Sequence, residues 1–147
     1  MIALLQRVTD ACVTIGDRFV GAIGPGLLCF VCTEPDDDEA LADRLVAKVL
    51  ALRVFADESG KMNLDLGTVG GGLLVVSQFT LAAETSRGHR PGFSKAASPE
   101  LARRLYERVL ETARRLHPVV ASGEFGADMR VSLVNDGPVT IPITLRR

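Results

Sequence analysis

The chain has almost no net charge and no long apolar run, and each of these absences excludes a class of protein. Its 17 basic and 18 acidic side chains give a formal net charge of −1. A protein that grips long nucleic acid needs a strongly basic surface, so we expect no DNA partner and only local contact with RNA. No segment approaches the roughly 18 consecutive apolar residues of a membrane span, and no basic stretch precedes a long apolar run at the start. We therefore expect a cytoplasmic protein without membrane contact.

Cysteine is scarce, and its placement adds no chemistry. Cys12, Cys29 and Cys32 each lie in an apolar run, where a thiol usually behaves as a small hydrophobe. Cys29 and Cys32 have C-x-x-C spacing, but residues three apart on a strand point to opposite faces. Four zinc ligands are not visible at any compact spacing. We expect no metal and no cofactor.

Familiar catalytic motifs are also missing. No G-x-S-x-G elbow is present, and the histidines, His89 in a basic loop and His117 at an expected helix end, belong to no nucleophile-base motif. The glycine-rich GTVGGG at 67–72 leads into a strand, whereas a phosphate loop leads into a helix. These observations disfavour an ordinary serine hydrolase and a nucleotide-phosphate loop.

The apolar pattern predicts many strands and two main helices. Asp36 is expected to cap the first helix, and Ser98 the second, which has Pro99 at its first position and ends near His117. Strands and helices do not alternate regularly, so we predict an α+β fold: a mostly antiparallel or mixed, barrel-like sheet in a single domain over 1–147. The expected strands lie at 2–8, 11–15, 18–23, 27–32, 52–55, 61–66, 73–81, 119–125, 129–134 and 139–145.

The stretch LLVVSQFTL at 73–81 begins as a buried strand and ends in polar residues. On a strand, Ser77 and Phe79 face one way while Gln78 and Thr80 face the other, so at least one polar side chain meets the packed side. Burying it without a partner would cost about 1–3 kcal/mol. Periodicity leaves two interpretations open: an internal hydrogen-bond network, or a strand end that faces a reacting group.

Two loops carry further candidates. VNDGPVT at 134–140 separates the last two expected strands and has the composition of a hairpin connection. The loop TSRGHRPGFSK carries Arg87, Arg90 and Lys95, which could hold phosphates or simply be solvated. The residues alone do not decide between these alternatives.

Several short motifs occur together in a specific order. SQFTL at 77–81 and NDGPVT at 135–140 are joined by the opening LLQRV, the central GKMNL, the RPGFSKAA loop and FGADMRVSLV. In this combination the chain resembles the D-aminoacyl-tRNA deacylase (D-tyrosyl-tRNA deacylase) family, from the first strand to about Thr140.

The resemblance implies a homodimer that hydrolyses the ester between a D-amino acid and the 3′-terminal adenosine of tRNA. Such an enzyme clears mischarged tRNA for translation, and the family also accepts achiral glycine. The residues Ser77, Gln78, Phe79 and Thr80 would line the site, with main-chain amides around Gln78 and Phe79 stabilising the oxyanion.

The resemblance also assigns a stereochemical filter. Gly137-Pro138 would form a cis peptide that enters the partner subunit's pocket and collides with an L side chain, and Arg7 would brace it. Phe125 and Met129 match positions near the terminal adenine. Without the resemblance, both would be read as core packing.

The catalytic step has two possible forms. Thr80 could act as a nucleophile or proton relay, but no activating base is identifiable nearby in the sequence. We prefer an amide oxyanion hole assisted by the RNA's 2′-hydroxyl, because an aminoacyl ester is already reactive. The rival functions are a non-catalytic RNA-end binding protein, a general small-ester hydrolase using Ser77 or Thr80, and an interaction or structural domain.

Overall fold

A computed structural model describes all residues from 1 to 147. Six strands form one mixed sheet in the order β2-β1-β3-β6-β7 with β8 also paired to β1, while β4 and β5 form a two-stranded sheet. The strands are β1 (Ile2–Ile15), β2 (Arg18–Ile23), β3 (Gly26–Cys32), β4 (Phe55–Ala56), β5 (Met62–Leu64), β6 (Gly72–Ser77), β7 (Val120–Ser122) and β8 (Arg130–Thr144). The helices are α1 (Glu39–Ala51), α2 (Leu66–Val69), α3 (Pro99–Leu116) and the 3-10 turn η1 (Phe79–Ala82).

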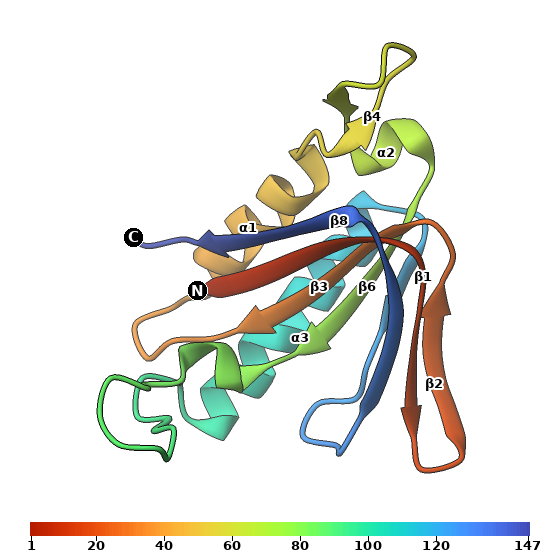
Figure 1. The fold of residues 1–147 in the computed structure, drawn as a ribbon. Helices are drawn as coiled ribbons and strands as arrows, with labels where there is room; N and C mark the ends of the chain where they lie inside the picture. The colour runs from red at the N-terminus through yellow and green to blue at the C-terminus, as the bar shows by residue number, and fades with distance from the viewer.

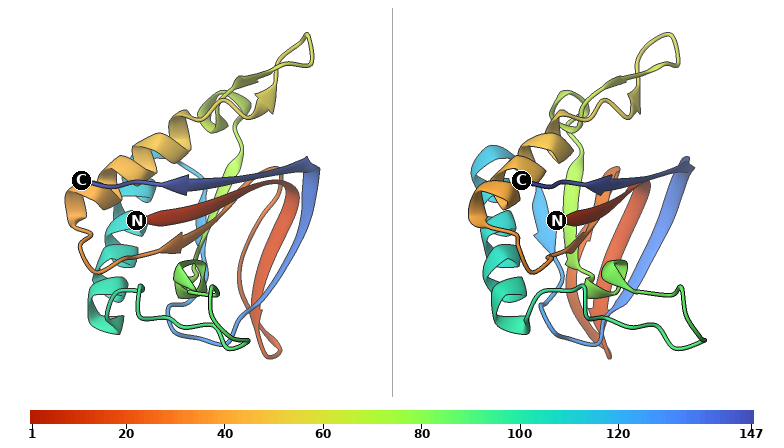
Figure 2. Two further views of the ribbon diagram at one scale, coloured as in Figure 1. Left: turned by 60° about the vertical axis from the view of Figure 1, so that its left-hand side comes forward. Right: turned by 90° about the vertical axis from the view of Figure 1, so that its left-hand side faces the viewer.

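The large sheet curls into a nearly closed, barrel-like shape, and the two long helices pack along one side of it (Figures 1 and 2). The pairs β3–β6 and β6–β7 are parallel, whereas β1 pairs antiparallel with β2, β3 and β8. The predicted α+β fold with a mixed, barrel-like sheet and two main helices is therefore confirmed. None of the helices combines the length and apolar character needed to cross a membrane.

The long strands β1 and β8 correct the predicted strand boundaries. Segments 2–8 and 11–15 belong to one strand, and segments 129–134 and 139–145 lie largely within another. The two strands pair from Ile2 opposite Thr144 to Thr14 opposite Arg130. Local polar residues do not end either strand, because each is held by hydrogen bonds to a partner distant in sequence.

The central strands are buried on both faces, as their continuous apolar runs predict. In β6, Leu73 and Val75 join the core cluster beneath α1 and α3, while Leu74 and Val76 join the cluster on the opposite face of the sheet. This alternation ends at Ser77, where β6 stops beside the end of β3.

The helix ends differ from prediction in one place. Asp38, not Asp36, caps α1, since its Oδ1 accepts from the Leu41 N–H at 2.9 Å. Ser98 caps α3 as predicted, and His117 follows the end of that helix. His117 is buried, with its Nε2 2.7 Å from the Gly71 carbonyl oxygen.

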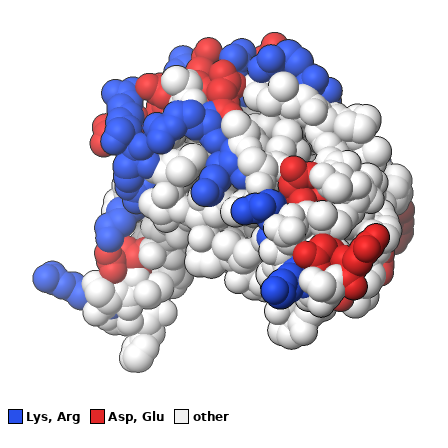
Figure 3. Space-filling model, turned by 90° about the horizontal axis from the view of Figure 1, so that it is seen from above, with Lys and Arg blue, Asp and Glu red and all other residues white.

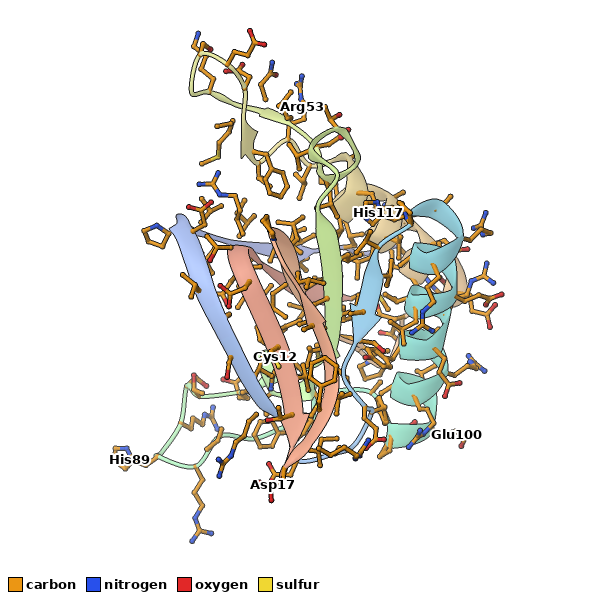
Figure 4. All side chains as sticks on the ribbon, turned by 90° about the vertical axis from the view of Figure 1, so that its right-hand side faces the viewer. Cys12, Asp17, Arg53, His89, Glu100 and His117 are labelled. Atoms are coloured by element: carbon orange, nitrogen blue, oxygen red, sulfur yellow. The ribbon has the colours of Figure 1, made fainter.

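Two peripheral segments extend from opposite ends of the molecule. The β4–β5 hairpin carries Arg53 at its base, and the loop with His89 lies at the far end (Figure 4). The strands expected at 52–55 and 61–66 are shorter in the structure, and the glycine-rich segment after them contains the short helix α2. Lys and Arg side chains are interspersed with Asp and Glu on the face in Figure 3 rather than covering it.

Candidate active site

An open cavity of about 600 Å³ lies where β3 and β6 end, next to the start of α3. Thirteen of its 19 lining residues are hydrophobic, so it suits a flat, largely apolar group. The lining comes from five segments: 31–33, 76–79, the loop residues Phe93, Ala96 and Ala97, Pro99, Ala102 and Tyr106 of α3, and 125–129 with Val131. The chain brings the predicted residues Ser77, Gln78, Phe79, Phe125 and Met129 together here.

The polar end of β6 is a turn, which corrects the predicted strand over 73–81. The Gln78 N–H donates to the Val31 carbonyl at 2.8 Å and closes the ladder with β3. The chain then enters η1, in which the Leu81 N–H donates back to the Gln78 carbonyl at 3.2 Å. The alternation of faces predicted for residues 77–80 is therefore wrong, because the chain leaves the strand after Ser77.

This turn determines which main-chain N–H groups lack an acceptor and could bind a substrate oxygen. The Gln78 amide already has an acceptor, so it is not free to bind a substrate oxygen. Phe79 and Thr80 open the turn, and the first amides of a helical turn find no acceptor within it. The two free donors are thus one position later than the pair expected from the sequence.

The side chains of the turn contain no general base. Gln78 Nε2 donates to Thr80 Oγ1 at 2.5 Å, and Thr80 is exposed and outside the cavity lining. A carboxamide nitrogen cannot accept the hydroxyl proton. The Thr80 hydroxyl therefore has no activating partner in this contact.

Phe125 and Met129 line the cavity and also pack against the core clusters. The Phe125 ring lies 5.9 Å from that of Tyr106, with the Arg103 guanidinium 4.7 Å from its centroid on the α3 side. A Cβ on Gly123 would come within 2.6 Å of Met129 Sδ. Glycine at this position therefore leaves room for the methionine in the wall.

Phe93 was not predicted to belong to the site. Its ring meets that of Phe79 edge-on at 5.1 Å, and the two side chains remain 38% and 54% exposed at the cavity rim. The sequence signal for Phe93 is its place as the only aromatic residue of the basic loop TSRGHRPGFSK.

Gly137 and Pro138 lie in a bulge of β8, outside the cavity lining of their own chain. Their peptide bond is cis, and both residues are exposed. Gly137 has φ +133°, and a Cβ there would meet Val139 Cγ2 at 2.8 Å, so only glycine fits. The predicted hairpin connection is thus a bulge within one continuous strand.

Arg7 contacts this bulge. Its Nε donates to the Asp136 carbonyl at 3.1 Å and lies 3.4 Å from Asp136 Oδ2. Its Nη1 donates to the Val54 carbonyl at 2.6 Å. The guanidinium therefore joins the bulge to the segment before β4.

The three basic loop residues are not equivalent. Lys95 forms a salt bridge with Glu84. The hydrogen bond from Lys95 has the largest effect on the pKa of Glu84, and together with hydrogen bonds from Ser86 it lowers this pKa to about 2. Arg87 and Arg90 are exposed and form no salt bridge. They are the available cations of this loop.

The cysteines behave as hydrophobic residues. All three are free, and burial raises the pKa of Cys29 to about 12 and raises that of Cys32. Such thiols carry little thiolate at neutral pH. No group of three or more His, Cys, Asp or Glu residues is arranged to hold a metal ion.

Comparisons with known proteins found relatives that match the chain over nearly its whole length. A D-aminoacyl-tRNA deacylase of Methylibium petroleiphilum is 63% identical over 145 residues, covering 99% of this chain and 95% of that protein. A D-aminoacyl-tRNA deacylase of Azoarcus sp. is 61% identical over 145 residues, covering 99% and 96%. These relatives share the whole length of the chain.

Solved structures share the fold. The structure of a c-Myc DNA unwinding element binding protein superposes with a TM-score of 0.94 at 38% identity, covering all of both chains. That of a probable eukaryotic D-amino acid tRNA deacylase gives 0.85 at 17% identity, covering 97% of each chain, and supports the fold alone.

The barrel-like sheet, the cavity and the full-length relatives place the protein in the class of aminoacyl-tRNA deacylases. The model of the D-Tyr-tRNA(Tyr) deacylase family matches residues 4–144. The chain belongs to that family.

Proposed function

We propose that this protein hydrolyses the ester of D-aminoacyl-tRNA and releases the free D-amino acid and tRNA. The observation that carries the proposal is the turn η1 beside the cavity: Phe79 lines the cavity, and the amides of Phe79 and Thr80 find no acceptor within the turn. Two neighbouring N–H groups without an acceptor in the turn would suit an ester carbonyl whose oxygen becomes negative during hydrolysis.

The cavity would hold the 3′-terminal adenosine. Its apolar lining suits the faces of a base, and Phe125 and Met129 supply an aromatic and a thioether surface for adenine. The aminoacyl ester would then extend toward Phe79 and Thr80. A single buried nucleoside requires few phosphate contacts, which is compatible with a net charge of −1.

Hydrolysis would proceed through a tetrahedral intermediate. Water attacks the ester carbonyl carbon, and the carbonyl oxygen becomes an oxyanion that accepts from the two amides. Collapse breaks the bond to the ribose oxygen, which leaves with a proton as the tRNA hydroxyl. The carboxyl group carries the new oxygen from water.

The RNA, rather than a side chain, would assist proton transfer in this reaction. The Thr80 hydroxyl accepts a hydrogen bond from the side-chain Nε2 of Gln78, and no base is present to activate this hydroxyl as a nucleophile. The neighbouring 2′-hydroxyl of the terminal ribose lies beside the reacting ester in any aminoacyl-tRNA. Positioning and charge stabilisation then supply the rate.

Stereochemical selection would require a homodimer. The bulge with Gly137 and Pro138 is exposed and lies outside the cavity of its own chain, which suits entry into the pocket of a second copy. Backbone carbonyls there would exclude an L side chain, while a D-aminoacyl or glycyl ester presents only hydrogen to them. Glycine mischarged on non-cognate tRNA would therefore also be cleaved.

Arg87 and Arg90 would provide local contacts to tRNA phosphates, because they are the loop cations without a carboxylate partner. This limited contact suits a cytoplasmic enzyme that meets many tRNAs and reads the aminoacylated end.

Three compounds distinguish this proposal from its rivals. Hydrolysis would be measured for a D-aminoacyl-tRNA and for the matching D-aminoacyl methyl ester, and binding would be measured for the uncharged tRNA. We expect rapid hydrolysis of the first and negligible hydrolysis of the second. Equal cleavage of both esters would indicate a general esterase. Tight binding of uncharged tRNA without turnover of the charged form would indicate an RNA-end binding protein.

A further inference from the structure

The bulge in β8 is closed by side chains that the proposed chemistry does not use. Between the pairs Gln6↔Thr140 and Val8↔Asn135, β1 has one residue and β8 has four. Asn135 spans the opening, since its Oδ1 accepts from the Val139 N–H at 3.1 Å and its Nδ2 donates to Thr140 Oγ1 at 2.9 Å. Gln6 Nε2 donates to the same hydroxyl oxygen at 3.2 Å.

We propose that Gln6, Asn135 and Thr140 form a clamp whose function is to set the stereochemical selectivity of the enzyme. This inference rests on the proposed function and extends it to three positioning residues. None of them lines the cavity. Their hydrogen bonds instead tie the two ends of the bulge to each other and to β1.

The clamp is needed because the exposed part of the bulge has no ladder support. Gly137 and Pro138 pair with no residue of β1, so the position of their carbonyls depends on the ends of the bulge. Arg7 holds the end at Asp136, and the clamp holds the end at Val139 and Thr140. Each end thus has its own support.

If the bulge excludes the L side chain by its shape, loss of this support should change the relative rates at which the L and D esters are cleaved. An L side chain would press against the bulge, and a loosened bulge would yield to it. A D-aminoacyl ester presents only hydrogen to the bulge, so its cleavage does not depend on how rigidly the bulge is held. Loss of the clamp should therefore raise cleavage of the L ester while sparing that of the D ester, whereas a general loss of stability would lower both together.

The test uses matched threonines on β8. Thr140→Val preserves the β-branched shape but removes the oxygen that accepts from Gln6 and Asn135. Thr144→Val is the control, because Thr144 is exposed on the same strand and its hydroxyl forms no hydrogen bond in the structure. Thr140→Ser restores the hydroxyl.

We would measure kcat/KM of each variant for D- and L-tyrosyl-tRNA. Losing both hydrogen bonds to the Thr140 hydroxyl should raise the L-to-D ratio by about tenfold in Thr140→Val. The ratio should stay at the wild-type value in Thr140→Ser and in Thr144→Val. Asn135→Ala also removes the acceptor of the Val139 N–H and should raise the ratio further.

Unchanged ratios in both Thr140→Val and Asn135→Ala, with a selective wild-type enzyme, would overturn the clamp and leave the proposed function standing. Equal losses for both esters would assign these residues to stability and also overturn the clamp. A wild-type protein that cleaves neither ester would overturn the proposed function and the clamp with it.

Discussion

Arg7 of β1 donates from Nε to the carbonyl oxygen of Asp136, 3.1 Å away and 129 positions later in the chain. The contact lies where β8 leaves its ladder with β1 and enters the bulge. Arg7 also holds the Val54 carbonyl, so one mostly buried guanidinium fixes three parts of the molecule relative to one another. The bulge is therefore held in position by contacts within its own chain.

Arg7→Ala should destabilise the fold and weaken selection together. Hydrogen bonds from charged donors contribute about 1.5–3 kcal/mol each, and only 14% of the Arg7 side chain is exposed, so we expect a loss of about 2–3 kcal/mol in the free energy of unfolding. Urea unfolding measures this change. Arg53→Ala is the control, because Arg53 makes one exposed contact to Asn63 and should change stability by less than about 0.5 kcal/mol. Equal losses in the two variants would refute the role of Arg7.

The amide of Phe79 can be removed by proline. Proline is tolerated at the first position of a helical turn, so Phe79→Pro should fold yet lack the N–H. Relative to Phe79→Ala, which removes only the ring, we expect kcat to fall by about 10²–10³-fold. Thr80→Ala should retain most activity because the Thr80 hydroxyl is not needed. Near-total inactivity of Thr80→Ala with the fold intact would instead favour a catalytic hydroxyl.

Gly123 should affect substrate binding through Met129. An added Cβ would lie 2.6 Å from Met129 Sδ, so Gly123→Ala should push the flexible methionine out of its place in the cavity wall. We expect KM to rise by about tenfold with little change in the free energy of unfolding. Combined with Met129→Ala, the same substitution should have almost no further effect, because the atom it displaces is gone. Additive effects in this double-mutant cycle would contradict the coupling.

The contact between the long helices should show a defined pH dependence. Asp43 of α1 accepts hydrogen bonds from Arg108 and Thr112 of α3, which lower its pKa from the ordinary 3.8 to about 2. A lowered folded-state pKa contributes stability above the unfolded value, and this is lost as pH falls from about 4 to 2. Allowing for solvent screening, Asp43→Asn should cost about 1 kcal/mol at pH 7.

Urea unfolding of wild type and Asp43→Asn between pH 2 and pH 7 measures this contribution, and the two should converge at the acid end. Glu111→Gln is the control, because Glu111 contacts Arg108 at 3.5 Å but is 72% exposed and should contribute little. A stability gap that does not change with pH would show that the charge of Asp43 is not its source.

The fold could be predicted from the sequence where the signals were local. The apolar runs of β3 and β6, the Ser98 cap and the two short strands on either side of residues 57–60 were predicted to within a few positions. The cap of α1 was misplaced because residues 36–38 are all aspartate. The choice is made by Asp37, whose Oδ1 lies 2.7 Å from the Met1 amino group, which leaves Asp38 to cap the helix.

The site could be predicted only in part, because its geometry depends on distant contacts. The composition of residues 134–140 predicts a hairpin connection rather than a bulge, because the sequence does not show that residues 130–144 follow β1 along its whole length. Likewise, the Gln78 amide was expected to be free, but the ladder with Val31 uses it. The motif resemblance pointed to residues of which Ser77, Gln78, Phe79, Phe125 and Met129 line one cavity, and the pairing of strands decides which of their main-chain atoms have partners within the chain.

The most direct test of the proposed activity compares two substrates that differ only in configuration. Purified protein would be incubated with D-tyrosyl-tRNA and, separately, with L-tyrosyl-tRNA, and the remaining ester would be measured over time. We predict rapid loss of the D ester while the L ester survives as long as in buffer alone. Cleavage of both esters at similar rates would contradict the account, because it would remove the stereochemical selection assigned to the bulge at Gly137 and Pro138.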